Sequence, residues 1–287
     1  MPQLALIVGV YLVGITFNTF LYGLVLAQFV TYFKTKFEDP LWIRTAVWSL
    51  LFTDTIHSVV EIYAIWQTCV ENYGNLASFG SVTWPIPFTA VATSVEAIIT
   101  QLFLAYRVFL LTHSKVLLGT ICVSSTLGFI FGLIAGIASG VIQEIAKFGR
   151  LVPFVVLWLT FQSLSDFIIS ASLIAVLARS RTGSRKTHAI INRLIQGAVE
   201  TGTLASIFAL ADLFSFVFFR NTNLYAMFGF PIGRIYTNTL LHTLNARAEL
   251  RNMESIIDCD LEGNSVFRLQ SRNRMASGGD VEIPKVN

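Results

Sequence analysis

The sequence predicts an all-α, polytopic membrane protein with seven transmembrane helices, an outside N-terminus and a cytosolic C-terminus. Of its 287 residues, 54% are hydrophobic and only 13% are charged, which is about half the charged share of an ordinary soluble domain. The mean hydropathy is +0.66. Uncharged apolar runs recur along the chain, and each is longer than the roughly 20 residues that a helix needs to cross a bilayer. These observations predict a multipass integral membrane protein.

The predicted elements follow one another with short polar connections. The seven predicted spans cover about residues 4–33, 43–70, 85–111, 116–142, 151–178, 189–219 and 224–244. Their lengths allow tilt in the bilayer. We therefore expect a seven-helix bundle over residues 1–245 and a cytosolic, mostly disordered tail over residues 246–287, where the sequence becomes polar and mixed in charge.

Local signals justify the individual elements in order. The first span carries no charge before Lys34 and has no basic segment in front of it, so we expect a retained helix rather than a cleaved signal. A Gly- and Asn-containing loop over 71–83 separates the second and third spans, and the third begins at Pro85. The most basic loop, 179–187, precedes the sixth span, and only residues 220–223 connect the sixth span to the seventh.

The distribution of lysine and arginine predicts the orientation. The loops after the first, third and fifth spans, together with the tail, hold all but four of the 20 basic residues. Three of these four, Lys147, Arg150 and Arg220, fall on the opposite side, and Arg234 falls inside the last span. Because basic residues accumulate on the cytosolic side, we expect the C-terminus in the cytosol.

Arg234 is the most informative single residue. An arginine at the bilayer centre costs about 2.5–3.5 kcal/mol on insertion scales, so it requires partners inside the protein. Helical spacing places acidic and polar side chains at a similar depth on other spans. The predicted intramembrane polar network consists of Asp54, His57, Glu61, Glu96, Asp166, Glu200, Asp212, Arg234, Asn238 and His242. Such a network serves a ligand, ion or proton site, or else it holds helices together.

The fourth span has a different character. Gly128, Gly132, Gly136 and Gly140 repeat every four residues and leave a smooth groove on one face of the helix. Stripes of small residues let membrane helices approach closely. We expect tight packing within the bundle, with a homodimer through this span as the alternative.

Several segments resemble a fungal membrane family, common in basidiomycetes, that is known only as domain of unknown function 6534. The segments that carry the resemblance are Ser180-Arg-Thr-Gly183, Ile191-Asn-Arg-Leu-Ile195, Glu200-Thr-Gly202, Asn221-Thr-Asn223 and the run from Phe230 to Arg247. The signature region covers about residues 159–247. The resemblance implies a seven-helix membrane protein and assigns no activity.

The resulting functional expectation is a receptor-like seven-helix sensor, with a proton-coupled transporter or carrier that uses midplane carboxylates as the alternative. We expect neither an enzyme nor a cofactor. The two membrane histidines are too few for a catalytic zinc site, which usually has three protein ligands. The expected partners are the lipid bilayer and an unidentified ligand, without nucleic acid. The sequence does not distinguish the plasma membrane from other membranes.

Overall fold

The computed structural model describes residues 2–35, 38–73, 83–142, 149–180, 185–219 and 224–247, and the side chains of 2–7, 177, 179–180, 185–196 and 198–201 are outside this description. The helices in chain order are α1 (Pro2–Thr35), α2 (Leu41–Trp66), the π-helical turn η1 (Gln67–Glu71), α3 (Pro85–Thr112), α4 (Lys115–Ile142), α5 (Val152–Ser180) and α6 (Arg185–Phe218). Residues 224–247 form a further helix, called here the C-terminal helix. No strand occurs in these ranges, so the predicted all-α class is confirmed for the described chain.

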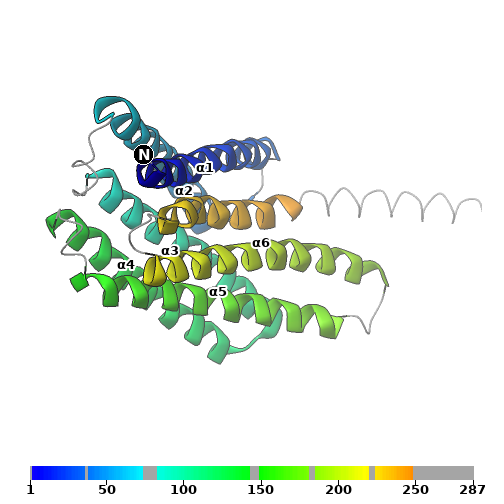
Figure 1. Ribbon diagram of the computed structural model, residues 1–287. Coiled ribbons are helices and arrows are strands. Elements are labelled where there is room, and N and C mark those ends of the chain that lie inside the picture. The colour runs from blue at the N-terminus through cyan, green and yellow to red at the C-terminus, as the bar shows by residue number, and fades with distance from the viewer. Residues whose placement is uncertain are drawn as a thin grey trace, which may run out of the picture. The chain divides into compact units, whose positions relative to one another are not determined.

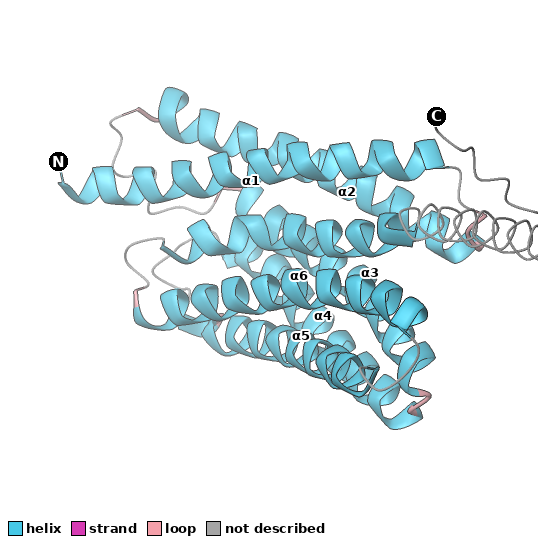
Figure 2. Cartoon of the chain, turned by 90° about the vertical axis from the view of Figure 1, so that its right-hand side faces the viewer, coloured by secondary structure: helices cyan, strands magenta, loops and turns pink. Residues whose placement is uncertain are grey.

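The helices run alongside one another as a bundle (Figures 1 and 2). Residues 1–245 form one compact unit. The predicted disordered tail lies almost wholly outside the described residues, which end at Arg247. The prediction for the tail therefore stays a prediction.

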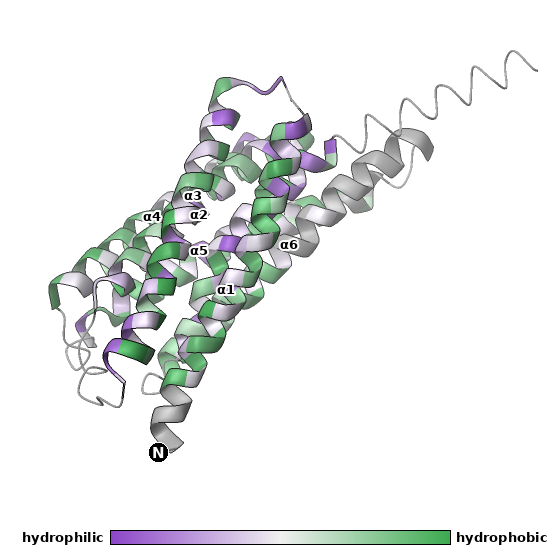
Figure 3. Cartoon of the chain, turned by 90° about the horizontal axis from the view of Figure 1, so that it is seen from above, coloured by the Kyte–Doolittle hydropathy of each residue, from purple (hydrophilic) through white to green (hydrophobic). Residues whose placement is uncertain are grey.

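Four helices are long and apolar enough to cross a membrane: Val8–Thr35, Pro85–Thr112, Lys115–Ile142 and Val152–Val176. Apolar residues extend along most of the described helices (Figure 3). This composition is compatible with an integral membrane protein. The count of seven spans stays a prediction, because α2, α6 and the C-terminal helix do not meet the same criterion over their described residues.

Local sequence sets the helix ends. Pro85 and Pro87 lie in the first turn of α3, where the missing amide proton costs no helical hydrogen bond. The same helix ends at His113, which adopts a left-handed conformation with φ 53° and donates its backbone N–H to Phe109 O. The next helix is capped by Ser114, whose Oγ accepts the backbone N–H of Leu117 at 3.4 Å.

The glycine stripe of α4 packs against α3 and α5 of the same chain. A Cβ at Gly136 would lie 2.8 Å from Val91 Cγ2 on α3, and a Cβ at Gly128 would lie 3.3 Å from the backbone nitrogen of Gln162 on α5. Hydroxyls reinforce the second contact, since Ser124 donates to Phe161 O at 3.0 Å. The stripe thus provides the close intramolecular approach expected of small residues.

A homodimer through this helix stays a prediction. The apolar side chains that α4 leaves exposed are Val116, Val123, Ile130, Ile134, Ile137 and Val141. Because the glycine stripe already contacts α3 and α5, a second copy would have to use this other surface.

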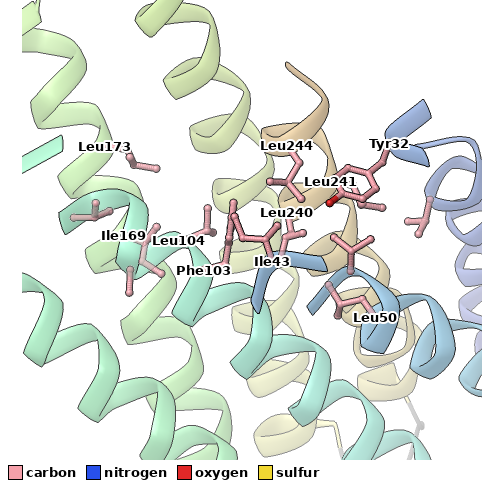
Figure 4. Packing of buried hydrophobic residues seen from close by; sticks show 14 of the residues in the cluster. Tyr32, Ile43, Leu50, Phe103, Leu104, Ile169, Leu173, Leu240, Leu241 and Leu244 are labelled. Atoms are coloured by element: carbon pink, nitrogen blue, oxygen red, sulfur yellow. The ribbon is translucent and has the colours of Figure 1, made fainter. Parts of the chain in front are cut away.

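An apolar core fills the half of the bundle that contains the end of α1 and the start of α2. It joins Phe29 and Leu50 to Leu104 and Leu173, with Leu240, Leu241 and Leu244 of the C-terminal helix among them (Figure 4). All seven side chains are at most 4% exposed. This half of the bundle is therefore closed by packed side chains.

The C-terminal helix lies between α1 and α6 (Figure 1). Its Ile232 and Tyr236 pack with Ala205 and Ala209 of α6. Toward α1, the approach is close at Gly14, where a Cβ would lie 2.9 Å from Met227 Cα. The C-terminal helix therefore packs closely against both α1 and α6.

Candidate functional site

Arg234 is fully buried and contacts carboxylates from two other helices. Its Nη1 donates to Asp54 Oδ1 of α2 and to Glu96 Oε1 of α3, the latter at 3.0 Å. Its Nη2 donates to Ser58 Oγ at 3.2 Å, and its Cζ lies 5.7 Å from the centroid of the Tyr22 ring, in cation–π range. The guanidinium thus ties α1, α2, α3 and the C-terminal helix together.

His57 extends this group away from the arginine. Its Nδ1 lies 3.2 Å from Glu96 Oε1, and its Nε2 lies 3.0 Å from Glu61 Oε1 without hydrogen-bond alignment. Glu61 in turn accepts a hydrogen bond from Asn18 Nδ2 of α1. We call Arg234, Asp54, Glu96, Ser58, His57, Glu61 and Asn18 the arginine cluster.

Helical spacing and one glycine explain how the arginine cluster forms. Asp54, His57 and Glu61 are three and four residues apart on α2, so they share one buried face. Glu96 reaches the arginine only because residue 233 is glycine, since a Cβ there would overlap the Glu96 carboxylate. The sequence Gly233-Arg234 therefore supplies both the charge and the space for its partner.

The arginine cluster holds more acidic than basic groups. Three carboxyls face one guanidinium and one imidazole, and all of these side chains are at most 1% exposed. Even with both bases cationic, neutrality requires a proton on one carboxyl. Oxygen atoms Asp54 Oδ2 and Glu96 Oε2 are buried without a hydrogen-bond partner among the described residues. The cluster is thus a strongly coupled charged centre with spare hydrogen-bonding capacity.

A second buried group, the tyrosine cluster, surrounds Asp166 of α5. It comprises Tyr236, Asp166, Gln101 and Gln162. The Tyr236 hydroxyl donates to Asp166 Oδ2, and Gln101 Nε2 donates to Asp166 Oδ1 at 2.8 Å. Gln162 Nε2 donates to the Tyr236 oxygen at 3.1 Å. Asp166 is therefore satisfied by neutral donors rather than by Arg234.

A cavity of about 180 Å³ lies at the end of the bundle that contains the start of α3 and the end of α6. Every described helix except α2 contributes to its wall, including Tyr11 of α1, Thr93 of α3, Ser139 of α4 and Asp212 of α6. Gln67 and Thr68 of the π-helical turn also line it, and π-turns are frequent at functional sites. Gln162 lines the cavity as well, so the cavity wall is connected directly to the tyrosine cluster.

The structure divides the sequence-predicted network into separate groups. Asp54, His57, Glu61, Glu96 and Arg234 meet in the arginine cluster. Asp166 belongs to the tyrosine cluster, and Asp212 lines the cavity. The single midplane site expected around Arg234 is thus resolved into two clusters and a cavity, because Asp166 on α5 pairs with Tyr236 and Asp212 on α6 lines the cavity.

The remaining predicted residues lie toward the other end of the C-terminal helix or are not described. Asn238 Oδ1 accepts a hydrogen bond from Gln28 Nε2 of α1 at 2.5 Å. His242 is exposed, with its ring against Gly197 of α6. The side chain of Glu200 lies outside the described residues. Neither Asn238 nor His242 is therefore part of the two clusters.

Sequence reasoning missed several members of the clusters. Asn18 lies in the first predicted span, which has no charged residue, so charge alone does not indicate it. A lone amide side chain in an apolar span is nevertheless a signal of a buried polar contact. Tyr236 and Gln101 carry no formal charge, so the pattern of charged residues in the spans does not include them. Their amphipathic side chains, which need a hydrogen-bond partner when buried, were the available signal.

Comparison with known proteins finds a match to one family, whose function is unknown. Residues 162–249 match the sequence model of a family described as a family of unknown function, DUF6534, in support of the resemblance seen in the sequence. No curated protein and no solved structure matches the chain. Among the described residues, no group of three or more His, Cys, Asp and Glu side chains is arranged to hold a metal ion.

Proposed function

We propose that this chain is a seven-helix membrane sensor that takes a small ligand into the cavity between its helices. The observation that carries the proposal is the position of the cavity. Every described helix except α2 lines it, and Gln162 in its wall is hydrogen-bonded to Tyr236 of the C-terminal helix. A ligand that contacts this wall would favour one helix arrangement over another, which is what a receptor requires.

The seven-span part of the proposal is supported by the outward faces of the helices that do not meet the criterion for a membrane span. On α2, the buried charges face inward while large apolar side chains at helical spacing face outward: Trp48, Phe52, Val59, Ile62 and Trp66. On α6, the corresponding outward side chains are Leu204, Ile207, Leu210, Phe214 and Phe218. The C-terminal helix is buried along residues 230–237, so it needs no lipid-facing surface. The described part of α6, Gly202–Phe218, is itself apolar and is only shorter than the 18 residues that the criterion requires.

An outside N-terminus and a cytosolic C-terminus would place the cavity on the outer side. The charge distribution supports this orientation. An epitope at the N-terminus should bind antibody on intact cells, whereas one at the C-terminus should bind only after permeabilisation. The reverse pattern would overturn the orientation.

The closed inner half distinguishes a sensor from an open channel. The core around Leu240, Leu241 and Leu244 fills the bundle on the side away from the cavity, and within the sensor the tyrosine cluster connects the two halves. Pro231 lies in the C-terminal helix between the cavity-lining residues Phe230 and Ile232, five residues before Tyr236. Because proline cannot donate the helical hydrogen bond at its position, this is where the C-terminal helix would bend.

A Gln162→Leu variant tests the sensor. The full chain is expressed with G-protein reporters, and a small-molecule library is screened at confirmed surface level. For any active compound, we expect the variant to keep ligand-induced thermal stabilisation while the cellular response falls, because the wall remains but its link to Tyr236 is lost. Thr89→Val, at another wall position, is the control and should retain the response. No response to any compound or to pH would refute the sensor.

A proton-coupled carrier is the second candidate, favoured by the excess of carboxyls in the arginine cluster. Buried carboxyls with exchangeable protons are typical of proton relays. Uptake of protons or solutes into proteoliposomes, compared between wild type and Asp166→Asn, separates the two functions. Flux that the substitution abolishes would favour the carrier, and equal flux in both would remove Asp166 from any transport role.

A further inference from the structure

We propose that the cavity is selective for a small organic cation, an ammonium compound carrying an apolar group, with Asp212 as its counter-ion. This inference rests on the proposed sensor and names the chemical class of its ligand. Three observations lead to it: the state of Asp212, the space beside its carboxylate, and the aromatic side chains around the cavity.

Asp212 is a buried carboxylate that lines the cavity. It is 8% exposed, and it forms no hydrogen bond or ion pair with any of the described residues. Other buried acids of the bundle have partners, for example Arg234 for Asp54 and Tyr236 for Asp166. A carboxyl group that is removed from water without a partner can carry its charge only at a large desolvation penalty. A cation that enters the cavity would relieve this penalty, whereas an anion would increase it.

The space beside the carboxylate is kept open by a glycine. Gly229 of the C-terminal helix faces Asp212, and a Cβ at this position would lie 3.2 Å from Asp212 Oδ2. Any larger side chain would cover the carboxylate oxygen that faces the C-terminal helix. With glycine there, that oxygen is accessible to a donor inside the cavity.

Aromatic rings supply the rest of the cation's environment. The cavity is lined by Tyr11, Trp158, Phe216, Tyr225 and Phe230. Tyr225 and Phe216 pack edge to face with ring centroids 5.5 Å apart, as do Tyr11 and Phe230 at 5.0 Å. Aromatic faces attract ammonium groups through their quadrupole, and they also accept the apolar part of the same ligand.

The volume limits the size of the ligand. A cavity of about 150 Å³ accommodates a benzene-sized guest, and this one measures about 180 Å³. A single aromatic ring or a short branched chain with one ammonium group therefore fits.

Three small ligands of similar shape but different charge test whether the cavity prefers a cation. The full chain in neutral phosphatidylcholine nanodiscs is titrated with benzylamine, which is cationic at pH 7, with benzyl alcohol, which is neutral, and with benzoate, which is anionic. Binding is followed by thermal stabilisation and by quenching of tryptophan fluorescence. We expect benzylamine to bind about tenfold or more tightly than benzyl alcohol, because a charge-assisted hydrogen bond is added, and benzoate to bind most weakly. This comparison uses wild-type protein, so it does not depend on a variant that folds.

Variants then locate the site. Asp212→Asn should remove the preference for benzylamine while leaving the affinity for benzyl alcohol, and Gly229→Ala should weaken benzylamine selectively by crowding the carboxylate. Gly119→Ala, at an exposed position outside the cavity lining where a Cβ meets nothing within 4 Å, should leave the preference intact. Equal binding of benzylamine and benzyl alcohol to the wild type, or an unchanged preference in Asp212→Asn, would overturn the cation proposal while leaving the sensor intact. Cation-selective binding with no cellular response would instead refute the sensor and retain this inference.

Discussion

Replacing Arg234 with leucine tests whether the arginine cluster holds the bundle together. The substitution removes the ion pairs to Asp54 and Glu96, the hydrogen bond to Ser58 and the contact with the Tyr22 ring. The two carboxylates would remain fully buried and lose their cation. Breaking a buried pair by removing one partner costs about 3–5 kcal/mol.

That energy predicts a large thermal effect. For a chain of this size, each kcal/mol shifts the melting temperature by about 2–4 °C. The Arg234→Leu variant should therefore melt about 6–20 °C below wild type, with a lower yield of folded protein. Size-exclusion chromatography of detergent-solubilised protein after heating, followed by tryptophan fluorescence, measures both quantities.

Neutralising the partners provides the matched control. In a triple variant that combines Arg234→Leu with Asp54→Asn and Glu96→Gln, no buried charge is left without its partner. Because well-packed neutral groups often replace buried ion pairs at little cost, we expect the triple variant to recover most of the lost stability. Wild-type stability of the single variant, or a triple variant no better than the single, would refute the electrostatic reasoning.

Three further substitutions probe the packing and hydrogen bonds of the bundle. Gly233→Ala should lower stability by about 1–3 kcal/mol, because its Cβ displaces the Glu96 carboxylate from the arginine. Tyr236→Phe should cost about 1–3 kcal/mol, because its hydroxyl no longer satisfies the buried tyrosine cluster. Gly136→Val should cost about 1–3 kcal/mol or more by forcing α4 away from Val91 of α3. Chemical or thermal denaturation in one detergent measures all three.

Each of these substitutions has a control variant that makes a similar change of side chain at a position without the tested contact. Gly23→Ala and Gly119→Ala introduce a Cβ with nothing within 4 Å, so neither should destabilise, and alanine's helix propensity favours them. Tyr106→Phe changes an exposed ring and should stay within about 0.5 kcal/mol of wild type. If a control loses as much stability as its partner variant, the corresponding contact does not carry the effect.

The sequence determined the class of the protein and most of its helices. Long apolar runs leave few alternatives to helices, because a chain in lipid must satisfy its backbone hydrogen bonds internally. Proline at the start of α3 marked that boundary. The need of Arg234 for buried acidic partners also followed from its cost in an apolar environment, and helical spacing identified the α2 face that supplies Asp54.

Only the tertiary structure decided which acids belong together. Counting residues along each predicted span places Asp166 and Glu96 at the same depth in the membrane. The rotation of each helix about its axis, however, turns Glu96 to the arginine and Asp166 to Tyr236. Depth follows from the rise along a single helix, whereas partner choice depends on how neighbouring helices pack. The same packing left Asp212 in a cavity with aromatic walls, an arrangement that arises from several helices at once and from no single stretch of sequence.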